Sequence, residues 1–136
     1  MQQPIITKKY FFCASHKYGN ADWTDEENYR VFDKDFNNHG HNYVLEVSIK
    51  GDIKSDTGWL TDLGTLNNVV KNNIINIIDH SQIEVDIPWF KNKQPSSENI
   101  LIWAWEIIAP KIKEGFLFRI RLVETHSIYT DYFGPQ

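Results

Sequence analysis

The stretch from His41 to Ile49 alternates apolar and polar side chains, and this pattern constrains the fold more than any other in the chain. Its apolar side chains recur at every second position, at Tyr43, Leu45, Val47 and Ile49. Because successive side chains of a β-strand point to opposite faces, these four residues share one face. The segment is therefore predicted to be a strand whose apolar face is turned toward a core.

Three more segments are predicted to be strands. Residues 5–14 are rich in β-branched and aromatic side chains and form a strand that ends near His16. Residues 116–122 alternate apolar side chains with arginines, and residues 128–133 have a similar composition. Together with the stretch around Leu45, these segments provide four strands.

Two helices are expected between the second and third strands. Apolar residues recur at helical spacing over residues 61–78, which predicts an amphipathic helix. A second helix is expected to begin near Ser96, whose hydroxyl suits a helix cap, and to continue to about Ile108. Pro110 then bends or ends this helix, because proline lacks the backbone N–H that a helix needs.

Residues 17–34 are polar and are expected to form a long loop, and residues 88–95 are expected to be irregular. The element order is then ββααββ, within a single domain that spans residues 1–136. This order predicts an α+β fold, with a four-stranded antiparallel sheet and both helices on one face. The other face and the edges of such a sheet stay uncovered, which favours an oligomer.

The overall composition argues against several classes of function. A formal net charge of -4 does not suit a nucleic-acid scaffold, because phosphate binding needs a basic face. The single cysteine, Cys13, rules out an internal disulfide and fits a reducing cytoplasm. No apolar run approaches the roughly 20 residues of a membrane span, and the first residues lack the layout of a secretion signal. We therefore expect a cytoplasmic protein that binds neither nucleic acid nor membranes.

The sequence His39-Gly40-His41 suggests a metal site. On an extended segment, His39 and His41 point to the same side, and His16 lies upstream at the end of the first predicted strand. Three neutral imidazoles with a fourth position left open are typical of a catalytic zinc site. The spacing alone also allows a pair of solvated histidines.

Several short motifs occur in an order and spacing that together are highly specific. They are Phe12-Cys13-Ala14-Ser15-His16, Asp25-Glu26-Glu27-Asn28, His39-Gly40-His41-Asn42-Tyr43, Gly51, Thr57-Gly58, Asp62-Leu63, Asp79-His80, Ser97-Glu98-Asn99 and Glu124-Thr125. On these residues, which span nearly the whole chain, the sequence resembles the 6-pyruvoyltetrahydropterin synthase and 6-carboxytetrahydropterin synthase family. The long segment 20–32 is more similar to the pyruvoyl branch and its bacterial relatives than to the shorter carboxy branch.

The resemblance implies the tunnelling fold (T-fold), in which subunits close into a trimeric barrel and two trimers stack into a homo-hexamer. It implies a Zn2+ ion bound by His16, His39 and His41, and 7,8-dihydroneopterin triphosphate as the substrate. The implied function is a zinc-dependent carbon–oxygen lyase of pterin biosynthesis. Pterin sites are then expected to lie between subunits.

By the same resemblance, His80 is a proton-transfer group supported by Asp79, Glu124 anchors the aminopyrimidine edge of the pterin, and Glu98 assists the pocket. The residues alone also allow simpler interpretations. Asp79-His80 suits a helix end, Glu124 a solvated strand end, and Glu98 the acidic first turn of a helix. The triphosphate needs cations, and four residues are candidates without an assignment: Lys17, Lys34, Arg119 and Arg121.

The chain departs from the family at one position. Family members carry a catalytic cysteine shortly before the His-x-His pair, but an alignment on Phe32 and Lys34 places Asp35 there. An ungapped alignment from His39 reaches Asp33 instead, which is also an aspartate. We predict Asp35 as a catalytic base. The reference pKa values are ~3.9 for Asp and ~8.5 for Cys, so an aspartate in place of the cysteine binds a proton more weakly by at most ~6 kcal/mol.

Alternatives to this role stay open. Asp35 could complete the zinc shell as a fourth ligand, which would close the site. The same scaffold could form a 6-carboxy or a 6-hydroxymethyl pterin by carbon–carbon cleavage, and some family members with an acidic residue at this position form the latter. The chain could also be a non-catalytic pterin-binding protein. Cys13 is no simple substitute for the missing cysteine, because it points to the opposite side of its strand from His16.

Overall fold

Four strands form one antiparallel sheet in the order β1-β2-β3-β4 in the computed structural model, which describes residues 2–136. The strands are β1 (Ile5–His16), β2 (His39–Lys50), β3 (Phe116–Thr125) and β4 (Ile128–Tyr132). Each strand pairs antiparallel with the next one along the chain. The four predicted strands and their antiparallel arrangement are thus confirmed.

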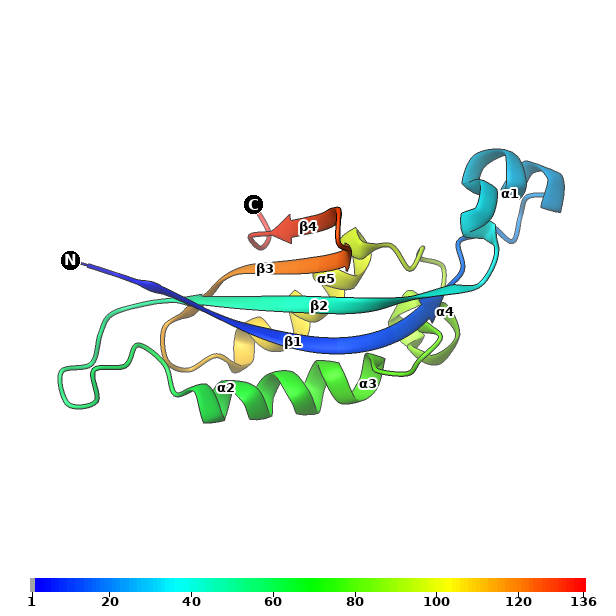
Figure 1. Cartoon of the computed structure of the whole chain (residues 1–136). Helices are drawn as coiled ribbons and strands as arrows, with labels where there is room; N and C mark the ends of the chain where they lie inside the picture. Colours follow the sequence, from blue (N-terminus) through cyan, green and yellow to red (C-terminus); the bar gives the residue numbers. More distant parts are fainter. Residues whose placement is uncertain (1) are drawn as a thin grey trace.

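Two long helical segments cover one face of this sheet (Figure 1). The first consists of α2 (Leu63–Val70), a π-helical turn (Lys71–Ile75) and α3 (Asn76–Ile78). The second is α5 (Ser97–Ile108). Asp62 caps α2 by accepting from the Gly64 N–H, and Ser96 caps α5 by accepting from the Asn99 N–H. Such caps satisfy backbone donors that have no partner within the helix. Both predicted helices are confirmed.

The prediction of a loop over residues 17–34 is wrong in its second half. Residues Asp25–Phe32 form α1, and a 3-10 turn over Asp33–Phe36 follows it. The missed signal is Thr24-x-x-Glu27, in which the Thr24 side chain accepts from the Glu27 N–H at 3.1 Å. Helix α1 projects from one end of the sheet (Figure 1), and its one buried residue is the polar Asn28. Its polar composition therefore gives no apolar stripe that would predict a helix.

The connection from α3 to α5 also contains regular structure. It includes the short helix α4 (Ile83–Asp86) and a 3-10 turn over Pro88–Phe90. The predicted irregular stretch 88–95 therefore begins with a helical turn. The buried Phe90 ties this turn to the core.

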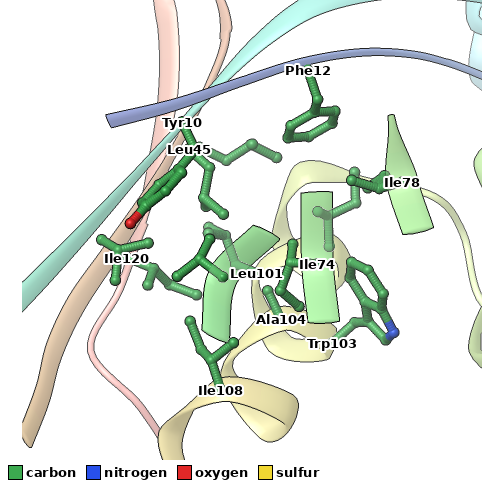
Figure 2. Close-up of a cluster of buried hydrophobic side chains, with 14 of the residues drawn as sticks. Tyr10, Phe12, Leu45, Ile74, Ile78, Leu101, Trp103, Ala104, Ile108 and Ile120 are labelled. Carbon is green, nitrogen blue, oxygen red and sulfur yellow. The ribbon is translucent and has the colours of Figure 1, made fainter. Parts of the chain in front are cut away.

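The core lies between the sheet and the helices. The four alternating residues of β2 are each at most 1% exposed, as their period predicts: Tyr43, Leu45, Val47 and Ile49. Figure 2 shows Leu45 and Phe12 of the sheet above Ile74 and Leu101 of the helices. Burying one such side chain contributes roughly 1.5–3 kcal/mol, so this layer provides a rigid base for the strand ends.

The opposite face of the sheet carries large exposed side chains. Phe11 of β1 is 69% exposed and Tyr129 of β4 is 57% exposed. No helix within residues 2–136 is both long enough and apolar enough to cross a membrane.

Candidate functional site

Three imidazoles converge at one end of the β1–β2 pair. The strand register places His16 opposite His39 and Ala14 opposite His41. Paired residues share a face of the sheet, and so do residues two apart on one strand. All three histidines therefore lie on the helix-covered face, and their ligand nitrogens lie within 4.8 Å of one another. This arrangement could hold a metal ion.

The outer nitrogens of two imidazoles are held by backbone carbonyls. His16 Nδ1 donates to the Pro95 oxygen at 2.8 Å, and His39 Nδ1 donates to the Asn37 oxygen at 2.8 Å. With the proton on Nδ1, each ring directs an unprotonated Nε2 toward the cluster. Carbonyl partners of this kind orient metal-binding histidines.

One nitrogen of the cluster lacks a partner. His16 is 1% exposed, and its Nε2 has no hydrogen-bond partner among the described residues. A buried polar group left unpaired costs roughly 1–3 kcal/mol. A metal ion bound at this nitrogen would remove that cost, so the donor set fits a metal.

The surroundings favour the neutral form of His41. Burial lowers the pKa of His41; Glu124 opposes this effect, while the nearby His16 and His39 add to it. The neutral imidazole is the form that binds a metal ion.

Glu124 faces the same cluster from β3. Its Oε1 lies 3.9 Å from His41 Nε2 and 4.0 Å from His16 Nε2. Ser97, the first residue of α5, donates from its hydroxyl to the same Oε1 at 3.4 Å. The buried Leu122 two residues earlier shares this face, which explains why Glu124 points into the protein rather than to solvent. The interpretation of Glu124 as a solvated strand end is therefore wrong.

Two groups at this site were missed from the sequence. Ser97 lies in the Ser97-Glu98-Asn99 motif, which by itself indicates no role for the hydroxyl, and the alternation of β2 predicts a core residue at Tyr43. Tyr43 is buried, and its hydroxyl has no partner within residues 2–136. Burial, and next the charge of Glu124, raise the pKa of Tyr43 above its ordinary value. The phenol therefore stays protonated and is a donor available to a ligand.

Glu98 follows Ser97 in the first turn of α5 and is exposed. Its charge contributes, after burial and Glu124, to raising the pKa of Tyr18. This places Glu98 in the electrostatic neighbourhood of the site. Its role in the pocket stays a prediction.

Asp35 approaches the cluster from the 3-10 turn. Its Oδ1 lies 3.7 Å from His39 Nε2, and its side chain is 61% exposed. It forms no ion pair with His16 or His41 among the described residues. Asp33 forms no ion pair with any of the three imidazoles in residues 2–136. Of the two aspartates, Asp35 is therefore the one that lies beside the imidazoles. Its correspondence to the family cysteine stays a prediction.

Asp79 and His80 lie at the edge of β1 instead. The His80 N–H donates to the Cys13 oxygen at 2.6 Å, and the Cys13 N–H donates to Asp79 Oδ1 at 3.0 Å. Adjacent residues seldom face one another, but the φ angle of 64° at His80 turns the chain sharply. As a result, His80 Nδ1 lies 3.0 Å from Asp79 Oδ2.

The Asp79-His80 pair is separate from the imidazole cluster. In the described part of the chain, neither residue forms a hydrogen bond or ion pair with His16, His39 or His41. The Cys13 N–H, and then His80, hold the pKa of Asp79 below its ordinary value. One chain therefore does not bring all the predicted catalytic residues into a single site.

Comparisons with known proteins show which family the chain and its fold belong to. The family model described as "6-pyruvoyl tetrahydropterin synthase" matches residues 5–135. A 6-pyruvoyl tetrahydrobiopterin synthase of Dictyostelium discoideum is 35% identical over 130 residues, covering 96% of each chain. One of Drosophila melanogaster is 30% identical over 98% of this chain and 83% of its own length.

A solved structure is also similar over almost the full length. The 6-pyruvoyl tetrahydropterin synthase of Caenorhabditis elegans superposes with a TM-score of 0.92 at 27% identity, covering 99% of this chain and 98% of that one. The match confirms the predicted T-fold topology of the subunit. On the family model, the relatives and the fold together, this chain belongs to the 6-pyruvoyl tetrahydropterin synthase family.

Proposed function

We propose that this protein is a zinc-dependent carbon–oxygen lyase of the pyruvoyl branch, acting on 7,8-dihydroneopterin triphosphate. The observation that carries the proposal is the convergence of His16, His39 and His41 within 4.8 Å, with the Glu124 carboxylate within 4.0 Å of two of them. The relatives named as 6-pyruvoyl tetrahydrobiopterin synthases support the choice of reaction.

The three imidazoles are the proposed zinc ligands. Their number leaves a coordination position for a substrate oxygen, which is the arrangement of catalytic rather than structural zinc sites. When bound, zinc would supply Lewis acidity to the side-chain hydroxyls of the pterin. The carbonyls of Pro95 and Asn37 keep the rings of His16 and His39 in a fixed tautomer and orientation.

Glu124 is the proposed anchor of the pterin ring. Its carboxylate can accept two parallel hydrogen bonds from the aminopyrimidine edge, which presents two donors in one plane. Ser97 holds one of its oxygens and so limits rotation of the carboxylate. Glu98, next along the chain, is proposed to assist the same pocket.

The elimination requires at least two proton transfers near the bound side chain. A carbon-bound proton has to leave as the bond to the triphosphate breaks, and a proton then has to return to the side chain. Asp35 is the proposed base beside the imidazoles, because its Oδ1 lies 3.7 Å from His39 Nε2. His80, supported by Asp79, is the proposed proton-transfer group on the other side.

Product analysis tests the proposed reaction. Zinc-loaded protein incubated with 7,8-dihydroneopterin triphosphate should release triphosphate and form a 6-pyruvoyl tetrahydropterin. Release of acetaldehyde or glycolaldehyde would instead show carbon–carbon cleavage to a 6-carboxy or 6-hydroxymethyl pterin. The carboxylate at Asp35 favours this second candidate. Tight pterin binding without turnover would show a non-catalytic binding protein.

The proposed assembly is a homo-hexamer of two stacked trimers. The uncovered sheet face, with Phe11 69% exposed, and the edges at β1 and β4 are surfaces that a closed barrel would bury. Mass measurement in solution should give six chains, or three where trimers do not stack. A stable monomer at micromolar concentration would contradict the barrel and the shared site together.

We place this enzyme in the cytoplasm, without nucleic-acid or membrane partners.

A further inference from the structure

Cys13, to which no role has been assigned, lies against the Asp79-His80 pair at the edge of β1, and its side chain points to the sheet face opposite the three imidazoles. Cys13 Sγ lies 3.7 Å from His80 Nε2, although the two residues are 67 positions apart in the chain. The other nitrogen of the same ring, Nδ1, lies 3.0 Å from Asp79 Oδ2. The imidazole thus bridges a thiol and a carboxylate, one through each nitrogen.

The backbone holds these groups in register. The Cys13 N–H donates to Asp79 Oδ1, and the His80 N–H donates to the Cys13 oxygen. The Ser15 N–H donates to the Ser81 oxygen at 2.8 Å, which fixes the segment after α3 along the edge of β1. The triad is therefore built by strand-edge pairing and does not depend on a flexible loop.

The cluster is accessible to a ligand. Cys13 and His80 line an open pocket of about 360 Å³ together with Gly40 and Asn42. The His80 side chain is 78% exposed, so it can exchange protons with solvent or substrate. Cys13 is partly exposed and is the one cysteine in the sequence.

The contacts favour a proton relay over a second metal site. The thiol, carboxylate and imidazole atoms lie within 4.8 Å of one another, as metal ligands also do. However, Asp79 Oδ1 accepts from the Cys13 N–H, while Oδ2 faces His80. Because the thiol lies at Nε2 and the carboxylate at Nδ1, chelation of one ion by all three groups would break one of the two ring contacts, whereas a relay uses both as they stand.

We propose that Cys13, His80 and Asp79 form a thiol–imidazole–carboxylate triad in which Cys13 is a catalytic proton-transfer group for the pterin reaction. His80 accepts the thiol proton at Nε2, and Asp79 orients the ring at Nδ1. The thiolate then removes a proton from the carbon adjacent to the one that bears the triphosphate. The electron pair of that C–H bond forms a double bond as the C–O bond to the triphosphate breaks.

The catalytic role of Cys13 rests on the proposed lyase activity. The reactivity of its thiol does not depend on that activity. Cys13 faces away from His16 on β1. In the proposed assembly, the triad of one chain would therefore serve a substrate held by the imidazoles of a neighbouring chain. Asp35 and Cys13 then act from two sides of the same ligand. Cys13 would thereby supply a thiol to a site in which residue 35 is an aspartate.

The first test measures alkylation of Cys13 by iodoacetamide at pH 7, without any pterin. The folded protein should react about tenfold faster than the same chain in urea, because the His80 ring in contact with the sulfur can take the thiol proton as the sulfur attacks. His80→Asn should lose this acceleration, since asparagine tolerates the positive φ but is not a base. Asp79→Asn, which keeps an acceptor for the Cys13 N–H, should lose part of it. Equal rates for wild type and His80→Asn would overturn the triad.

The second test measures turnover and metal content. Cys13→Ser should lower kcat at least ~100-fold, the lower range for a positioned acid–base group, with little change in KM. Unchanged kcat would overturn the role in the pterin reaction. A second zinc equivalent in wild type that Cys13→Ser loses would show a metal site instead. Absence of turnover in wild type would refute the lyase, and the alkylation rates would still decide the triad.

The third test mixes two inactive variants. Co-assembled Cys13→Ser and His41→Ala chains should recover part of the activity, because some sites then combine intact imidazoles with an intact triad from the neighbour. No recovery, with both variants assembled as in wild type, would overturn catalysis across the interface. Circular dichroism and melting curves of each variant verify that the fold is retained.

Discussion

Replacing His39 or His41 by alanine is expected to remove the bound zinc. Wild-type protein purified with zinc should retain about one equivalent per chain, as a three-imidazole site predicts. Each variant should lose well over ~100-fold in zinc affinity, since even the loss of a partner that orients a ligand costs ~10–100-fold. Metal analysis after dialysis measures this effect directly.

The fold of these variants should survive. The core consists of side chains such as Leu45 and Ile74, which lie away from the histidines and are buried without any metal. Zinc should raise the melting temperature of wild type, because it binds the native state, and should leave that of the variants unchanged. His126→Ala is the matched control, because His126 lies exposed in the β3–β4 turn outside the cluster. One zinc equivalent retained in both His39→Ala and His41→Ala would show that the ligand assignment is wrong.

Asp35→Ala is expected to reduce turnover by about 100- to 10,000-fold, the range typical of a positioned acid–base group. Zinc content and pterin affinity should stay nearly intact, because His39 and Glu124 are unchanged. Asp35→Cys should restore activity or redirect it toward the 6-pyruvoyl product, because a thiolate has the greater proton affinity. Steady-state kinetics and metal analysis on the same samples provide the readouts.

The same variant distinguishes a base from a fourth ligand. Asp35 Oδ1 lies 3.7 Å from His39 Nε2, a distance at which either role is open to it. Loss of zinc from Asp35→Ala would assign a ligand, and turnover could then rise as a coordination position opens. Asp33→Ala is the matched control on the same turn. Unchanged turnover and zinc in Asp35→Ala would rule out both roles and the alignment behind them.

Much of the fold was predictable because its signals are local. The period of two in β2 and the helical spacing in residues 61–78 reflect side-chain directions that each element sets by itself. Helix α1 was missed because its signal is a cap, Thr24-x-x-Glu27, rather than an apolar stripe. Its apolar residues are largely exposed, so neither composition nor periodicity marked it.

In the candidate site, too, some features follow from local geometry and others depend on tertiary packing. The shared face of His39 and His41 follows from strand geometry alone, and so does the opposite direction of Cys13 and His16. The pairing of His16 with His39 depends on the β1–β2 register, which joins residues far apart in the chain. The carbonyl of Pro95 and the hydroxyl of Ser97 reach the site only because α5 packs against this end of the sheet.

The sequence by itself therefore determined the elements, the metal-binding residue types and the family resemblance, because each of these depends on residue identity and short-range spacing. Only the tertiary structure decided which groups meet. It placed Asp35 beside His39 and His80 beside Cys13, because the register of the sheet and a left-handed turn at His80 set those distances. Contacts of this kind depend on packing between distant segments, and no local pattern encodes them.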